Sequence, residues 1–152
     1  MPTWIKMMES RWNKIKMTMK GIEEFVFLSV GALAGVFLRY RMMSSPIIVG
    51  ALPINVIAVN VIGSFILGIF SILSLLWNLD TKYSLLIAVG FCESLTTMSS
   101  FALETTNLID SRQFYTTAIN ILSNVGWSIG AVYAGRIIAS TIMLQLWRWE
   151  KR

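Results

Sequence analysis

The sequence predicts an all-α membrane protein with four transmembrane helices. The 152-residue chain is 55% hydrophobic and only 14% charged, whereas a soluble domain of this size carries considerably more charge on its surface. The apolar residues also gather in four long segments, each near the length of about 20 residues with which a helix crosses a bilayer. The chain length allows one domain.

The four predicted helices follow one another with short connections. They cover residues 25–43, 54–77, 83–109 and 114–138. Short links between four spans predict antiparallel neighbours and place both termini on one side of the bilayer. Residues 1–24 form a polar, basic N-terminal tail, expected as a helix on the membrane surface or as a loose segment. Residues 25–146 form the transmembrane domain, and residues 147–152, with Trp147 and Trp149, fit an interfacial tail.

The composition excludes several classes of function. Cys92 is the single cysteine and there is no histidine, so neither a disulfide framework nor a His/Cys metal cluster can form. Without an imidazole, and with a lone thiol, the chain offers no familiar catalytic constellation, and we expect no enzyme. The net charge is +5, but in so apolar a chain basic residues mark the edges of membrane spans, and we expect no nucleic-acid partner.

Small residues recur at four-residue spacing in three of the predicted spans. Such spacing lets helix backbones approach closely in lipid. We therefore expect helix packing at three sets of positions: Gly31 and Gly35, Ser64 and Gly68, and Gly126, Gly130 and Ala134.

The third predicted span contains an unusually polar stretch, "GFCESLTTMSSFALE", at residues 90–104. One interpretation is a continuous helix whose hydroxyl groups bond back to their own turn. The other is a discontinuous helix, which is tolerated at membrane depth where protein or an aqueous cavity surrounds it. A break would free carbonyl groups that can hold a cation and N–H groups that can face an anion. The spacing alone leaves both interpretations open.

Other polar residues also fall at membrane depth. Asn120, Asn124 and Ser128 repeat every four residues, and therefore share one face of the fourth span. Asn60 lies on the second span, and Arg39 lies near the end of the first. These side chains could hold the helices together, or they could line an ion path.

Three segments together resemble a known family. "GALAGVFLRY", "VNVIGSFILG" and "GFCESLTTMSSFALE", in this order and spacing within residues 28–138, are similar to the signature segments of the CrcB/Fluc fluoride channels. The resemblance implies a third helix broken near the midplane and an antiparallel, dual-topology dimer with two fluoride pores between its subunits. It also implies a structural sodium ion at the dimer centre, held by backbone carbonyls of the two broken helices.

The resemblance also assigns roles to single residues. Asn60 matches the pore asparagine that donates to fluoride, and Phe101 matches the second of two pore phenylalanines. The expected fluoride pore comprises Asn60, Phe101, Met98, Ser128, Asn124 and Arg39, and the expected sodium ligands are the carbonyls of Glu93 and Thr96. The physical requirement is clear, because fluoride gives up water only where close amide or hydroxyl donors replace it.

The sequence departs from the family pattern at several positions. Glu93 and Ser94 replace two glycines, Met98 replaces the first pore phenylalanine, and Asn55–Val56 replaces a Gly-Thr pair. Met98 offers a polarizable thioether in place of a ring edge. Whether both pores conduct is therefore left open.

The basic residues predict one fixed orientation. Nine lysines and arginines lie on the side of the two termini, against Arg41 and Arg112 on the other. This bias places the termini in the cytoplasm, and it favours a heterodimer with a paralog of opposite orientation over a homodimer. If translation begins at Met19, five basic residues remain against two, and the bias is weaker.

The predicted function is a fluoride-selective channel subunit in the cell membrane, which exports cytoplasmic fluoride passively and confers fluoride resistance. One alternative is a non-conducting partner subunit of a heterodimeric channel. A small multidrug exporter fits less well, because its proton coupling needs an acid in the first span, where Arg39 and Arg41 are the charged residues.

Overall fold

A computed structural model describes residues 3–45, 47–49 and 52–150. Within these residues, four helical stretches are long and apolar enough to cross a membrane: Met19–Met43, Ile54–Leu76, Thr81–Asp110 and Phe114–Trp147. The prediction of an all-α protein with four spans is therefore confirmed. The elements in chain order are α1 (Thr3–Met43), β1 (Ile48–Val49), β2 (Leu52–Pro53), α2 (Ile54–Leu76), α3 (Thr81–Ser84), the π-helix η1 (Leu85–Cys92), α4 (Glu93–Leu95), α5 (Met98–Asp110) and α6 (Phe114–Glu150).

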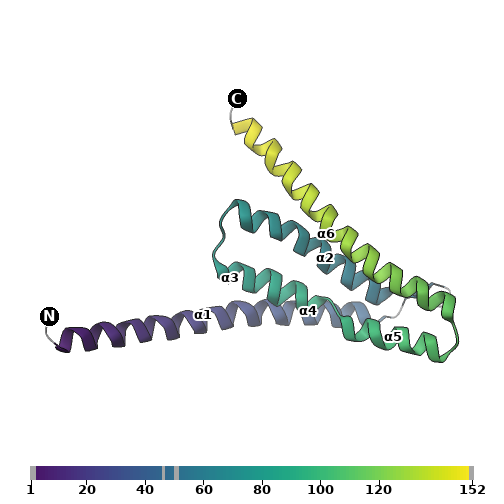
Figure 1. Ribbon diagram of the computed structural model, residues 1–152, viewed down its shortest axis with the longest axis horizontal. Helices are drawn as coiled ribbons and strands as arrows, with labels where there is room; N and C mark the ends of the chain where they lie inside the picture. The colour runs from purple at the N-terminus through teal and green to yellow at the C-terminus, as the bar shows by residue number, and fades with distance from the viewer. Residues whose placement is uncertain (1–2, 46, 50–51, 151–152) are drawn as a thin grey trace.

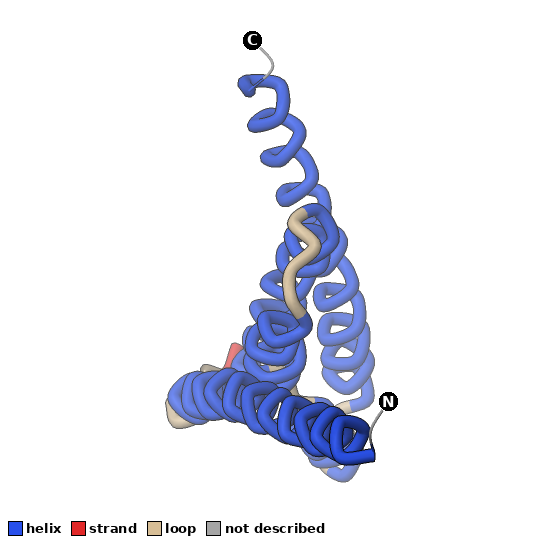
Figure 2. The backbone as a smooth tube through the Cα atoms, turned by 90° about the vertical axis from the view of Figure 1, so that its left-hand side faces the viewer, coloured by secondary structure: helices blue, strands red, loops and turns tan. Residues whose placement is uncertain are grey.

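The spans run back and forth along the bundle (Figure 1). The α1–α2 and α5–α6 connections lie at one end of the bundle, and the α2–α3 connection lies at the other, toward which both termini extend. The α2 helix packs mainly on α6, while α1 packs on η1 and α4. Seen from the side of the α2–α3 connection, α1 and α6 diverge strongly toward their free ends (Figure 2).

The basic N-terminal segment continues the first span as one helix. The α1 helix has 41 residues, which corresponds to about 60 Å, twice the thickness of a hydrocarbon core of about 30 Å. Its first turns therefore extend beyond the apolar span that begins at Met19. This helical continuity differs from the expected separate surface helix or loose tail.

Glycines allow the first span to approach the third. A methyl group at Gly31 would overlap the carbonyl oxygen of Leu86, and one at Gly35 would overlap that of Phe91. The expectation for this pair is confirmed. At the expected Gly68 of α2, a methyl group would overlap the backbone of Val132 on α6. Gly126 and Gly130 have open space beside them in the single subunit, and on α6 it is Gly135 that meets the backbone of Phe65 on α2.

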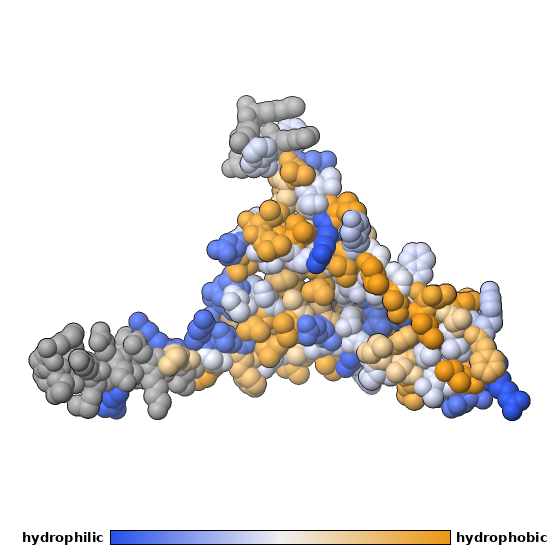
Figure 3. All heavy atoms as spheres, in the orientation of Figure 1, coloured by the Kyte–Doolittle hydropathy of each residue, from blue (hydrophilic) through white to orange (hydrophobic). Residues whose placement is uncertain are grey.

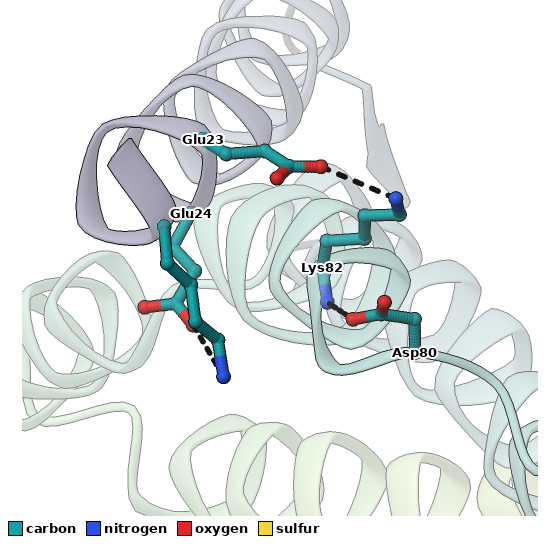
Figure 4. Close-up of polar contacts among 5 residues, drawn as sticks. Glu23, Glu24, Asp80 and Lys82 are labelled. Carbon is teal, nitrogen blue, oxygen red and sulfur yellow. Dashed lines mark hydrogen bonds and ion pairs between the residues drawn. The ribbon is translucent and has the colours of Figure 1, made fainter. Parts of the chain in front are cut away.

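Polar contacts anchor the beginning of the third span on α1 (Figure 4). The Lys82 ammonium lies 3.2 Å from a carboxylate oxygen of Glu23, and the Asp80 side chain accepts a hydrogen bond from the backbone N–H of Lys82. The Lys82 Nζ also lies 5.8 Å from the ring centre of Phe27. Phe27 in turn meets Tyr83 edge to face at 6.1 Å.

At the opposite end of the bundle, Asn55 holds the link between α1 and α2. Its amide donates to the carbonyls of Met42 and Ser45, and its oxygen accepts from the backbone N–H of Ile47. The short hairpin of β1 and β2, with Ile48 opposite Pro53, lies in the same link. Asn55 thus has a structural role in this link, since it is buried and satisfies three backbone groups.

The surface is apolar and the buried side chains include many polar ones. Figure 3 shows hydrophobic residues over much of the visible bundle, and Phe37, Trp127 and Tyr133 are exposed. Asn120 and Asn124 are buried instead. This arrangement is typical of a protein whose outer faces meet lipid or another apolar partner.

Candidate ion pathway at the break in the third span

The helix of the third span is interrupted at two residues. The α4 helix ends at Leu95, Thr96 (φ −74°, ψ 155°) and Thr97 (φ −148°, ψ 113°) are extended, and α5 begins at Met98. The prediction of a discontinuous helix is confirmed, and the continuous alternative is wrong. The Thr97 hydroxyl caps α5 by accepting from the backbone N–H of Ser100 at 3.2 Å, as Thr often does at such positions.

Side chains from α1 and α2 bond to the backbone groups that the break exposes. Arg39 donates from Nη1 to the Thr96 carbonyl at 3.2 Å. Asn60 binds Thr97 in both directions: its oxygen accepts from the backbone N–H at 2.8 Å, and its Nδ2 donates to the carbonyl at 3.3 Å. Because unpaired backbone groups at membrane depth are costly, Arg39 and Asn60 stabilise the interrupted conformation of the third span.

A chain of hydrogen bonds leads from Asn60 into the bundle. Asn60 donates to the Asn124 oxygen at 3.0 Å, and Asn124 donates to the Asn120 oxygen at 3.1 Å. Asn120 donates to the Thr105 hydroxyl at 3.1 Å. That hydroxyl donates to the Phe101 carbonyl at 2.7 Å. We call this connected set, from Thr97 through the three asparagines to Thr105 and the Phe101 carbonyl, the amide relay.

A cavity of about 240 Å³ lies beside the break. Residues of the second, third and fourth spans line it, among them Asn60, Ser64, Glu93, Thr96, Met98 and Ser128. The cavity therefore combines amide, hydroxyl, thioether and carboxylate groups at one place. Met98 is 73% exposed, so this face of the cavity is open in the single subunit.

The predicted site residues all come together around the break. Five of the eight line the cavity, namely Asn60, Met98, Ser128, Glu93 and Thr96. Asn124 is buried behind Asn60, Arg39 bonds to the Thr96 carbonyl, and Phe101 is buried with its carbonyl in the amide relay. Their roles toward fluoride or sodium stay predictions.

Sequence reasoning left three residues of the relay out of the site. The four-residue stripe on the fourth span already included Asn120, which is 0% exposed. Thr97 belongs to the polar stretch that predicts a possible break but has no predicted role in the site, and Thr105 lies just beyond that stretch. The importance of both depends on which turn of a neighbouring helix they meet. The stripe was therefore informative about one helix, but not about its partners.

The carbonyl oxygens at the break are the type of ligand that hard cations prefer. The Glu93 carbonyl accepts from the Thr96 hydroxyl at 3.4 Å, and the Thr96 carbonyl accepts from Arg39. Each carbonyl has a second lone pair, and hard cations prefer oxygen ligands. The donor chemistry thus fits sodium, and two such carbonyls per subunit would need oxygens from elsewhere to complete a coordination shell.

Taken together, these features define a four-span membrane protein with a broken third helix around a buried chain of amides. Residues 26–136 match the family described as CrcB-like protein, Camphor Resistance (CrcB). The chain belongs to this family.

The chain matches three relatives over nearly their full lengths. The chain is 57% identical over 125 residues to the Fluoride-specific ion channel FluC of Nitrosopumilus maritimus (strain SCM1), covering 82% of this chain and 98% of the relative. It is 40% identical to the protein of the same name from Methanocaldococcus jannaschii, covering 80% of this chain and 98% of the relative. The identity to that of Methanococcus vannielii is 35%, with coverages of 79% and 98%.

Proposed function

We propose that this protein is a subunit of a fluoride-selective channel through which cytoplasmic fluoride leaves the cell passively. The observation that carries the proposal is the amide relay, because it brings Asn60 to the wall of a cavity at the break of the third span. The relatives' printed name, fluoride-specific ion channel, supports the same ion. The family is one of ion channels, and the protein is not an enzyme.

Asn60 would meet the ion by exchanging a weak hydrogen bond for a stronger one. Its two amide hydrogens donate to Asn124 at 3.0 Å and to the Thr97 carbonyl at 3.3 Å. The longer bond is the one that an anion in the cavity would replace, since hydrogen bonds to ionised acceptors are roughly twice as strong as neutral ones. Ser128 and Met98 line the same cavity and would supply a hydroxyl donor and a thioether to the ion. Phe101 is buried and lies outside the residues that form the cavity wall.

We propose that the working unit is an antiparallel dimer. Glu93 and Met98 are both exposed beside the cavity, so a second subunit on this face would close the wall that one subunit leaves open. The basic residues favour a paralogous partner inserted in the opposite orientation, with the termini of this chain in the cytoplasm. In such a dimer the Glu93 and Thr96 carbonyls of both subunits would surround one sodium ion.

Fluoride efflux from liposomes tests the function. The chain alone, its Asn60→Ala variant and the chain with a co-expressed paralog would be reconstituted, and fluoride and chloride release followed with ion-selective electrodes. We expect fluoride-selective efflux that Asn60→Ala abolishes. Efflux from the chain alone would overturn the heterodimer, and silence of every folded combination would overturn the channel assignment.

The alternative of a non-conducting partner makes a different prediction in the same assay. It rests on Met98, where the family pattern has a phenylalanine, and it requires that Asn60→Ala leaves the efflux of the pair unchanged. Conduction that depends on Asn60 of this chain excludes it.

A further inference from the structure

We infer that Asn120 and Thr105 are positioning residues that fix the direction in which Asn60 presents its amide to the cavity. The inference deepens the proposed function and rests on it, because it concerns the same site. Asn120 lies on α6 and Thr105 on α5, and they act through Asn124.

The two ends of the amide relay have a fixed polarity. At one end the Thr97 backbone N–H donates to Asn60, and a backbone N–H can only donate. At the other end the Phe101 carbonyl accepts from the Thr105 hydroxyl, and a carbonyl can only accept. The single hydroxyl hydrogen of Thr105 is used in this bond, so a lone pair faces Asn120.

The amides between these ends have one self-consistent orientation. Each asparagine accepts through its oxygen from one neighbour and donates through its nitrogen to the next. Reversing a single side chain would set two NH₂ groups or two oxygens against each other. Asn120 is 0% and Asn124 4% exposed, so water cannot compensate for such a mismatch, and the penalty for an unpaired buried group applies in full.

Removing the Thr105 hydroxyl would release the far end of the relay. The Asn120 nitrogen would lose its acceptor. The Asn120 backbone carbonyl, to which Asn124 also donates at 3.2 Å, would still hold Asn124, but the support from the Asn120 side chain would be lost. Asn60 would keep its two bonds with Thr97, but the Asn124 oxygen that accepts its other hydrogen would be held less firmly. A larger share of molecules would then present the amide to the cavity in the wrong direction. The expected result is slower fluoride permeation without a change in the residues that line the cavity.

The chain provides a matched control one residue away. Thr106 donates to the Ala102 carbonyl at 2.9 Å, as Thr105 does to Phe101, but it is exposed. We would measure fluoride efflux for Thr105→Val, Thr105→Ser and Thr106→Val in the assembly that conducts. We expect Thr105→Val to slow efflux about tenfold, the equivalent of one lost buried hydrogen bond, and the other two variants to conduct like the parent protein.

Three results would overturn the inference: parental efflux in Thr105→Val, slow efflux in Thr105→Ser, or equally slow efflux in Thr106→Val. If Thr105→Val aggregates, Thr105→Ala removes the hydroxyl without the added methyl group.

The side-chain amide signals of ¹⁵N-labelled asparagine give a second readout that does not require conduction. Thr105→Val should shift the Asn60 and Asn124 signals and accelerate their hydrogen exchange, whereas Thr106→Val should not. An unchanged Asn60 signal in Thr105→Val would contradict the relay itself. Shifted signals in a protein that never conducts would instead contradict the proposed function and leave the relay intact.

Discussion

Changing Asn60 to aspartate tests the central donor with almost no change of shape. The aspartate keeps an oxygen for the Thr97 backbone N–H, but it places a second oxygen where the Asn60 Nδ2 now donates to Thr97 and Asn124. Two hydrogen bonds are lost and oxygens face each other, which we expect to destabilise the fold by about 2 to 4 kcal/mol. A carboxylate on the cavity wall also repels an anion.

The effect on permeation should exceed the effect on folding. A unit charge about 4 Å from the ion in an environment of effective dielectric constant about 20 costs about 4 kcal/mol, which corresponds to roughly a thousandfold slower passage. Fluoride efflux from liposomes and thermal unfolding in detergent would be recorded for Asn60→Asp and for Asn107→Asp, the same change at an exposed position of α5. Parental fluoride efflux in a folded Asn60→Asp protein would refute the reasoning that Asn60 faces the ion as a donor.

Three further changes test how the structure around the break is held. Gly31→Leu should prevent α1 from packing on η1, because even a methyl group overlaps the Leu86 carbonyl. The variant should therefore lose monodispersity in size-exclusion chromatography. Gly126→Leu, on an open face, should not cause this loss in the isolated subunit. Asn55→Ala leaves two carbonyls and one N–H of the α1–α2 link without partners, and a lower unfolding temperature is expected, by the equivalent of about 2 to 3 kcal/mol; an unchanged midpoint would contradict this. Arg39→Gln keeps a donor but removes the charge beside the Thr96 carbonyl, and we expect weaker fluoride permeation with a nearly parental unfolding temperature, whereas parental permeation would show that the charge is dispensable.

The spans were predictable from the sequence because each is a long apolar run with short polar links. The break was predictable only as one of two outcomes, since the hydroxyls of Thr96 and Thr97 fit either a helix that bonds to its own turns or an open segment. The structure decides this by contacts from other helices: Asn60 and Arg39 bond to the exposed backbone. Such long-range partners cannot be read from local spacing.

The packing of α6 on α2 shows the same limit. Gly126 and Gly130 have the four-residue spacing expected of an interface, yet it is Gly135 that approaches α2. Spacing identifies a face of a helix on which close approach is possible, but several such faces can exist on a long helix. Which of them is used depends on where the preceding links place the neighbour, and the Asn55 contacts that hold the α1–α2 link gave no signal in the pattern.

The break also bears on how a neutral amide at this site can present one end to an ion. An asparagine alone in an apolar bundle can turn either end toward an ion, and a cavity lined by freely turning amides would favour neither sign of charge. A backbone N–H cannot turn, and the extended Thr97 places one directly against the Asn60 oxygen at 2.8 Å. The nitrogen is thereby left to donate, toward Asn124 and the Thr97 carbonyl. Together with the far end of the amide relay, the break in the helix thus orients Asn60 as a donor, which in the proposed channel is what binding an anion at this wall requires.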